Sequence, residues 1–387
     1  MSLRAGAGVS TRADPLAAGA EAAEQASAGL SARRSDLALV FASGAHLAAP
    51  EAVLEGIRGV LEPATLIGCG AGGVLGAGRE LERETAVAVW AASFGRGEAV
   101  PFHAHVAGEG PEAELENLPD VEAATGVIVL SDPYSFPTEL ALTELFRRAP
   151  TIPVLGGLAS ARTHEGNGSL FFGGEVRDRG AVGVALRSVD LLPCVSQGAA
   201  PVGRELTITA GEGNVIHELA GRPALETVER VIGEMSGRER ALVAGGLLIG
   251  IVIDSGRPEY EQGDFLVRGV LGADPSTGSL VVGAGVHIGQ VVRLHARDAQ
   301  SADEDLHRAL RTRIEALAGQ PPAGAVVFSC NGRGRGMFGI PDHDALAVQN
   351  ELQGAPTAGF FAAGEIGPVG GRSFLHGFTA TVALFPG

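Results

Sequence analysis

The hydrophobic residues of this chain fall into short runs that alternate with helical segments, and one order of elements recurs three times. Each copy has a short apolar strand with a polar end, a helix, a proline, a second apolar strand that runs into glycines, and a further apolar strand. Short runs that are apolar at every position predict strands buried on both faces. The pattern therefore predicts an α/β fold built from repeated strand–helix–strand units.

The three copies have similar spacing. Their first strand, helix, second strand and following strand are residues 37–44, 50–61, 65–73 and 86–91; residues 126–132, 137–147, 152–160 and 181–186; and residues 325–332, 342–352, 357–365 and 378–384. Strand–helix–strand units of about 30 residues favour a parallel pair with a right-handed crossover. We therefore expect the three units to superpose, each with antiparallel additions.

Further elements are predicted outside the copies. An N-cap at Asp14 followed by Pro15 begins a helix that runs to about Leu30 and precedes the first strand. Ser301 and Glu304 form a capping box that opens a helix to about Leu317. Additional strands are predicted at residues 265–274 and 279–286 as a hairpin, at 291–296 in the same sheet, and at 241–253 as a buried strand pair.

The length of the chain predicts two domains. Its 387 residues exceed what one hydrophobic core usually organises. Proline and glycine interrupt the periodic sequence at residues 193–203, which is where a boundary is expected. We place the domains at residues 1–198 and 199–387, each with mixed parallel and antiparallel sheets flanked by helices.

Composition excludes several functions. The formal charge of −16 disfavours nucleic acid as a partner. All 29 basic residues are arginine, so Schiff-base lysine chemistry and a Walker-type phosphate lysine are absent. The chain has only three scattered cysteines and no signal-peptide pattern, which predicts a cytoplasmic protein. It also has no run of about 18 apolar residues, so no membrane partner is expected.

Glycine-rich strand ends are candidate ligand contacts because glycine lets backbone N–H groups approach a ligand closely. Gly70 and Gly156 are the candidates in the first two copies. Two GxGxxG matches also occur, but 58 glycines in 387 residues predict about 1.3 such matches by chance. Neither match therefore indicates a nucleotide site, and tight turns between packed strands are the favoured interpretation.

The segment FSCNGRGRGMFG, residues 328–339, carries the densest candidate chemistry. It ends a predicted strand, and ligands of parallel sheets bind beyond the carboxyl ends of the strands. Cys330, Asn331, Arg333 and Arg335 would project there, and arginine offers a rigid fork for a carboxylate or phosphate. The alternative is that Cys330 is a small buried hydrophobe and the arginines are solvated.

A second loaded segment, GFFAAGEIGPVGGRSFLHGFTAT, spans residues 359–381. Glu365, Arg372, His376 and Thr379 lie there among glycines and aromatic residues that otherwise read as core. Burying a carboxylate is costly unless it is paired, so Glu365 is expected to meet an arginine or a ligand amine. An internal pair of Glu365 with Arg372 or Arg333 is the structural alternative.

FSCNGRG followed by GFFAAGEIGPVGG and FLHGFTAT resembles the C-terminal domain of the FIST (F-box and intracellular signal transduction) family. SDLALVFAS, TLIGCGAGG, IPVLGGLAS and FFGGEVRDRGAVGVAL resemble its N-terminal domain. The resemblance implies a sensory module for small ligands such as amino acids, which would signal through a separate partner protein. No catalytic residues carry over; the candidate ligand contacts that do are Cys330, Asn331, Arg333, Gly364, Glu365 and His376.

A zwitterionic ligand, such as an amino acid, suits these residues best: arginine for its carboxylate, Glu365 for its amine and glycine for close approach. An enzyme with Cys330 as nucleophile and His343 or His376 as base is one alternative. A haem-binding gas sensor that uses one of the ten histidines is the other; no further cofactor and no metal site is expected.

The ligand site is predicted where loops of both domains face one another. The loops after residues 325–328 and 357–361 should open on one edge, opposite the loops after residues 65–67 and 152–155. Under this hypothesis Arg333→Ala weakens ligand binding and leaves the stability of the ligand-free protein nearly unchanged.

Overall fold

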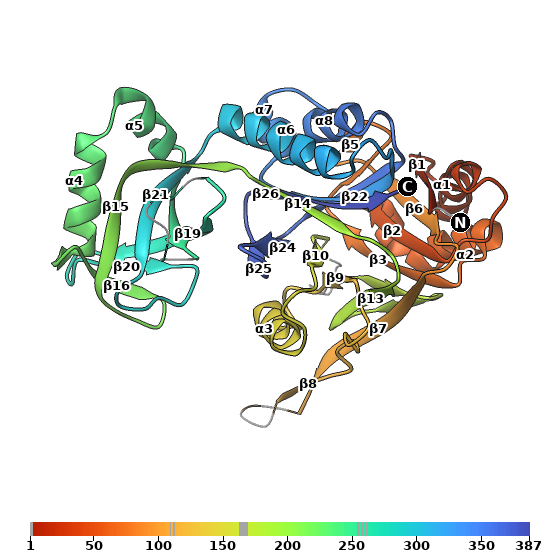
Figure 1. Cartoon of the computed structure of the whole chain (residues 1–387), viewed down its shortest axis with the longest axis horizontal. Helices are drawn as coiled ribbons and strands as arrows, with labels where there is room; N and C mark the ends of the chain where they lie inside the picture. Colours follow the sequence, from red (N-terminus) through yellow and green to blue (C-terminus); the bar gives the residue numbers. More distant parts are fainter. Residues whose placement is uncertain are drawn as a thin grey trace. The chain divides into compact units, whose positions relative to one another are not determined.

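The protein forms two compact units in the computed structural model, which describes residues 3–108, 110, 113–161, 169–253, 256, 259–260 and 262–387 (Figure 1). The first unit contains the described residues up to Val195, Leu306–Leu375 and Thr379–Gly387. The second contains Ser196–Asp305 and His376–Phe378.

The compact units do not follow the two halves of the chain. The first break, after Val195, lies beside the predicted boundary, but most of the last 80 or so residues return to the first unit. They return because their strands form the third of three interlocked sheets, as described below. A domain boundary between residues 198 and 199 stays a prediction.

Three repeats of one strand–helix–strand–strand motif build the first unit. In each repeat the first two strands are parallel neighbours, and the last pairs antiparallel with the other edge of the first. The shared strand order confirms the predicted α/β class with mixed sheets and repeated units. The elements are β2 (Leu37–Ser43), η1 (Gly44–Ala48), α2 (Pro50–Leu61), β3 (Thr65–Ala71) and β6 (Ala86–Ser93); β9 (Gly126–Ser131), α3 (Thr138–Arg148), β10 (Val154–Leu158) and β13 (Ala181–Arg187); and β22 (Pro322–Cys330), α7 (Gly334–Phe338), α8 (His343–Glu351), β23 (Thr357–Ala362) and β26 (Thr379–Pro386).

A hairpin completes each sheet, and it always follows a different repeat along the chain. The hairpin after β3 pairs with β23, the hairpin after β10 pairs with β3, and the hairpin after β23 pairs with β10. The exchange is cyclic, so no repeat can complete its own sheet. The hairpins are β4 (Val74–Gly76) with β5 (Arg79–Leu81), β11 (Leu170–Phe172) with β12 (Glu175–Arg177), and β24 (Glu365–Val369) with β25 (Arg372–His376).

One more strand borders each sheet on its other side. β1 (Arg4–Ser10), β7 (Glu98–Ala107) and β14 (Leu192–Gln197) pair with the last strands of the three repeats, and β8 (Glu114–Glu116) extends from β7. The three sheets consequently share one order of six strands.

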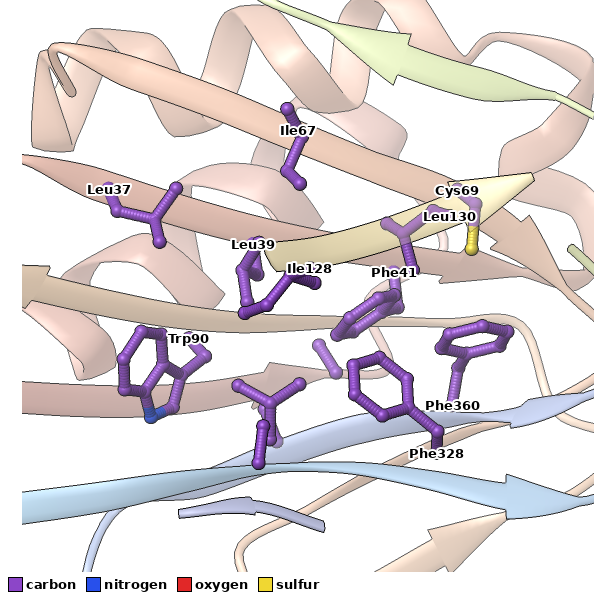
Figure 2. Packing of buried hydrophobic residues seen from close by; sticks show 14 of the residues in the cluster. Leu37, Leu39, Phe41, Ile67, Cys69, Trp90, Ile128, Leu130, Phe328 and Phe360 are labelled. Carbon is purple, nitrogen blue, oxygen red and sulfur yellow. The ribbon is translucent and has the colours of Figure 1, made fainter. Parts of the chain in front are cut away.

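The inner faces of the three sheets meet in one apolar core (Figure 2). Phe41, Leu130 and Phe328 occupy equivalent positions on the three first strands, and all three belong to this core. The Phe360 ring stacks on Phe41 with centroids 4.9 Å apart and meets Phe328 edge-on at 5.9 Å. Aromatic pairs in these arrangements add to the stabilisation from area burial.

Helices cover the outer faces of the sheets. The first sheet packs against α2 and α1 (Pro15–Gly29), which lie side by side in Figure 1. The second packs against α3, and the third against α8 and α6 (Ala299–Ala316). Because both faces are covered, β2, β3, β9 and β22 are buried along most of their length, which explains their uniformly apolar sequence.

The second unit has a different architecture. Every strand pair that the structure describes in it is antiparallel, and β15 pairs with both β21 and β16, so the pairing closes into a ring as in a barrel. The side chains of α4 (Ala224–Glu234) pack into its apolar core. Its other elements are β15 (Ala199–Glu212), β16 (Val215–Leu219), β17 (Arg222–Pro223), α5 (Gly237–Ala244), β18 (Leu247–Val252), β19 (Phe265–Asp274), β20 (Ser279–Val282) and β21 (Val291–Arg297).

Several predicted boundaries are confirmed and others are wrong. The Asp14 side chain caps α1 as expected, and the hairpin of β19 and β20 is present. The Ser301 capping box is wrong, because α6 begins at Ala299 and the Ser301 hydroxyl instead donates to Asp298. The predicted strand pair at residues 241–253 is a helix end followed by β18, and β1 was not predicted. No helix in the described part of the chain is both long and apolar enough to cross a membrane.

We predict that Gly68→Ala, Gly156→Ala and Gly359→Ala each destabilise the protein severely. A Cβ at these equivalent positions would lie 2.0, 1.8 and 1.9 Å from a backbone oxygen of the neighbouring strand. Backbone cannot yield as a side chain can, so we expect losses of about 3 kcal/mol, at the upper end of the usual cost of overpacking, in the free energy of unfolding. Chemical denaturation followed by Trp90 fluorescence measures this loss.

The matched control is Gly59→Ala. Gly59 is exposed on α2 and a Cβ there meets nothing within 4 Å, so this variant should gain about 0.5–1 kcal/mol from helix propensity. Wild-type stability in the three core variants would contradict the packing described above.

We also predict that the second unit loses stability in mild acid through His295. Burial lowers the pKa of His295 from 6.5 to about 4, although its Nδ1 pairs with the Arg293 carbonyl oxygen at 3.0 Å. Since the unfolded state takes up the proton first, this contribution is complete above pH 6.5 and is lost as the pH falls toward 4. The shift corresponds to roughly 3 kcal/mol.

Hydrogen exchange of the β18 and β21 amides between pH 7 and 4 tests this prediction. After correction for intrinsic exchange rates, protection should fall with pH in the wild type and less steeply in His295→Phe. The exposed His287→Gln variant should behave like the wild type. An equal pH dependence in His295→Phe and the wild type would assign the effect to other groups.

Candidate functional site

The carboxyl ends of three second strands meet at one place in the first unit. The Gly72 N–H donates to the Ser160 hydroxyl at 2.9 Å, and that hydroxyl donates to the Phe361 carbonyl oxygen. The Leu158 N–H donates to the Gly364 carbonyl oxygen at 2.8 Å. The ends of β3, β10 and β23 therefore lie together, and we call this place the loop junction.

The third repeat differs chemically from the other two at the loop junction. Glu365, Leu170 and Val74 are equivalent, because each begins a hairpin and pairs with the equivalent residue of a second strand: Gly157, Cys69 and Phe360. Two of the three equivalent residues are apolar. The fold itself therefore does not require a carboxylate at this position.

The neighbouring strand end differs in the same way. Cys330 lies two residues beyond Phe328, and its equivalents in the first two repeats are Ser43 and Asp132. The Ser43 hydroxyl donates to the Glu84 carbonyl oxygen, and Asp132 accepts from Ser135. Cys330 instead lies next to Glu365, with its Sγ 3.4 Å from the Gly332 N–H.

The Glu365 carboxyl is completely buried, and only one of its two oxygens accepts well-formed hydrogen bonds. Its Oε2 accepts from the Thr379 N–H at 3.1 Å and from the Thr379 hydroxyl at 2.8 Å. Its Oε1 has no well-formed hydrogen bond among the described residues, although the Cys330 thiol is close enough to influence it. Burial raises the pKa of Glu365 to about 8, against hydrogen bonds from Thr379 and Cys330 and the charge of Arg333.

Arg333 is buried in an ion pair. Its Nε and Nη2 donate to the Asp344 carboxylate at 2.6 and 2.9 Å, and both side chains have 0% exposure. Burial alone would raise the pKa of Asp344, but the Arg333 charge and donors, with His343 and Ser329, hold it well below its usual range. Arg333 Nη1 is buried without a hydrogen-bond partner among the described residues, and its charge acts on Cys330 and Glu365.

The exchanged hairpin holds this ion pair in place. Glu80 on β5 accepts the Asp344 N–H at 2.7 Å and the Ala345 N–H at 3.2 Å, so it caps the start of α8. Burial, with the charge of Asp344, raises the pKa of Glu80 to about 7. The His343 ring stacks on Phe338 at 3.4 Å and pairs with Asp344 at 3.0 Å.

Sequence models of known families match most of the chain. The FIST N domain matches residues 36–222, and the FIST C domain matches residues 224–368. The chain belongs to the FIST family. One relative is an uncharacterized protein of Mycobacterium tuberculosis, 43% identical over 398 residues that cover 99% of this chain and 100% of the relative. Another is an uncharacterized protein of Mycobacterium bovis, 41% identical over 383 residues that cover 99% of each protein.

The structure of this FIST protein brings only some of the candidate residues together. Cys330, Arg333 and Glu365 interact electrostatically, and Gly364 and Asn331 border them at the loop junction. Asn331 is exposed and its N–H donates to the Ala362 carbonyl oxygen at 2.9 Å. This group is the core of the candidate site.

The remaining candidates lie elsewhere. Gly70 and Gly156 are inside strands β3 and β10, where a Cβ would meet the Leu47 side chain or the Val129 carbonyl oxygen. Arg372 packs on Phe146 and Phe374 and donates to Thr143, so the alternative Glu365–Arg372 pair is not formed. His376 belongs to the second compact unit.

Sequence reasoning missed several internal partners of the candidate residues. Asp344 and Glu80 lie within helix and hairpin sequence that reads as surface, and Ser160 follows a glycine strand without a distinguishing motif. A usable signal existed for one residue. When the three repeats are aligned, Glu365 is equivalent to Val74 and Leu170. The carboxyl is therefore the one polar side chain at this position.

We predict that Arg333→Ala destabilises the ligand-free protein by about 3–5 kcal/mol, because it leaves Asp344 buried and uncompensated. The buried ion pair argues against the expectation that this variant keeps its stability. Arg333→Met/Asp344→Asn should recover part of the loss, and Arg335→Ala, at an exposed position, should cost little. Urea denaturation followed by Trp90 fluorescence measures these free energies of unfolding. Equal stabilities of Arg333→Ala and Arg335→Ala would contradict the prediction.

Proposed function

We propose that this chain is an intracellular sensory protein that binds a small metabolite of the amino-acid class at the loop junction. FIST domains are associated with sensing in signal transduction, and the chain contains both domains. A separate partner protein would receive the signal. Cys69, Cys194 and Cys330 are all unbridged and buried, which supports a reducing compartment such as the cytoplasm.

One observation carries the proposal: the third repeat places a carboxyl where the other two repeats place valine and leucine. Burial of Glu365 costs free energy, and one of its oxygens gains no good hydrogen bond in return. Perturbed buried carboxyls of this kind concentrate at functional sites. A ligand that supplied the missing partner would explain why the residue is present.

The free polar atoms define the ligand. Glu365 Oε1 would accept from an ammonium group, and Arg333 Nη1 would donate to a carboxylate oxygen. Asp344 occupies the rest of the guanidinium, so a bidentate carboxylate contact with Arg333 is excluded. Cys330 is 9% exposed and Asn331 is exposed, so access from their side suits a small molecule.

We predict that binding of an amino acid releases a proton near neutral pH. With a pKa of about 8, Glu365 is mostly protonated at pH 7 in the free protein, and an ammonium ligand favours its ionised form. Affinity should therefore rise between pH 6 and pH 8. A thermal-shift panel of amino acids finds the ligand, and calorimetry in buffers of different ionisation enthalpy counts the protons.

The variant Glu365→Gln tests the role of the carboxyl. Glutamine keeps an acceptor for Thr379 but has no charge, so affinity should fall by about tenfold to a hundredfold and proton release should vanish. Glu144→Gln is the control for loss of a carboxylate charge, because Glu144 pairs with Arg147 and Arg148 on α3, and this variant should leave the affinity unchanged. Equal affinities of Glu365→Gln and wild type would refute the proposed site.

A further inference from the structure

The surroundings of Cys330 combine three features that acyl transfer to a thiol requires. The residue ends β22 at the loop junction, and its side chain is nearly but not completely covered, at 9% exposure. The Cys330 thiol and the Arg333 guanidinium both lie close enough to Glu365 to affect the ionisation of its carboxyl. A nucleophile, a proton acceptor and a cationic donor are therefore adjacent.

We infer that Cys330 and Glu365 form a nucleophile–base pair that accepts the acyl group of a small ester or amide. The inference goes beyond ligand sensing, because it assigns a chemical activity that needs no signalling partner. It replaces the histidine base expected from sequence, since His343 is stacked on Phe338 and hydrogen-bonded to Asp344.

Comparison of the repeats separates this pair from ordinary core packing. At the equivalent positions the first repeat has Ser43 with Val74 and the second has Asp132 with Leu170, so neither combines a thiol with a carboxyl. The other two cysteines, Cys69 and Cys194, lie in apolar clusters. Burial raises the pKa of the Cys69 thiol well above its usual value.

The acylation step conserves atoms and charge. The Cys330 thiol proton moves to the ionised Glu365 carboxylate while the sulfur lone pair forms the S–C bond and the carbonyl π pair moves to oxygen. When the carbonyl re-forms, the C–O or C–N bond to the leaving group breaks. The leaving group takes that electron pair together with the proton from Glu365, and a thioester on Cys330 remains.

A second step restores the thiol. Water attacks the thioester carbonyl and gives its proton to the Glu365 carboxylate, and the carboxyl then returns the proton to the departing Cys330 sulfur. The products are a carboxylic acid and the free thiol. No oxidant, reductant or metal ion takes part in either step.

Arg333 Nη1 is the candidate donor for the negative oxygen that forms in each step. It is buried, it has no hydrogen-bond partner among the described residues, and its charge acts on Cys330 and Glu365. Nε and Nη2 are fixed on Asp344, so Nη1 is held in one orientation. Fixed donors in a site that excludes water stabilise developing charge well.

The test uses the full chain and p-nitrophenyl acetate. Wild type should release a burst of one nitrophenolate per chain, and peptide mapping should locate one acetyl group on Cys330. Cys330→Ser should abolish the thioester, and this variant should fold because the first repeat carries Ser43 at the equivalent position. Cys69→Ala is the matched cysteine control and should retain the burst.

Glu365→Gln tests the base. Its acylation rate should fall by about a hundredfold or more. In the wild type the rate should rise with pH to about 8, because burial sets the pKa of Glu365 there and its titratable and charged neighbours are Cys330 and Arg333. Glu365→Gln should not show that rise.

The outcomes separate this inference from the sensory role. Acetylation of other residues instead of Cys330, or an unchanged rate in Glu365→Gln, would overturn the acyl-transfer activity. Binding of an amino acid by Cys330→Ser with wild-type affinity would leave the sensory role standing when acylation fails. Acylation of Cys330 without binding of any amino acid would support the acyl-transfer activity and contradict the sensory role.

Discussion

The first unit depends on the exchange of hairpins among its three sheets. Each second strand would be an exposed edge if it did not receive a hairpin that follows another repeat. Within each repeat the first and second strands approach closely, and Gly68, Gly156 and Gly359 permit that approach at equivalent positions. It also explains why the end of the chain belongs to the same compact unit as its beginning: β24 covers the edge of the second sheet, and β4 covers the edge of the third.

The three repeats can be compared with one another, position by position. A residue type that occurs at all three equivalent positions, such as the close-approach glycine, is required by packing. A buried carboxyl that occurs once, such as Glu365, is not required by the packing that the three repeats share. The three repeats of one chain therefore distinguish the glycines that packing requires from the carboxyl that it does not. It also reinterprets Gly156, which looked like a ligand contact in isolation and is one of the three packing glycines.

Sequence predicted the repeats well, because buried strands and capped helices leave local signals. Asp14 and Pro15 mark the start of α1, and continuous apolar runs mark β2, β9 and β22. It could not predict pairings between distant segments, which leave no local trace. β1 has the sequence RAGAGVS, too poor in branched residues to read as a strand, and the buried role of Arg333 depends on Asp344 in a later helix. The residues of the loop junction were therefore recognised, but their internal partners were not.

The charges at the loop junction explain how one carboxyl can stay both buried and available. Asp344 accepts two hydrogen bonds from Arg333, and the Arg333 charge still lowers the pKa of Glu365, but burial of the carboxyl has the larger effect. The ion pair holds the buried guanidinium on Asp344, near the start of α8. Because burial raises the pKa of Glu365 to about 8, a cationic group that reached this carboxyl would favour its ionised form.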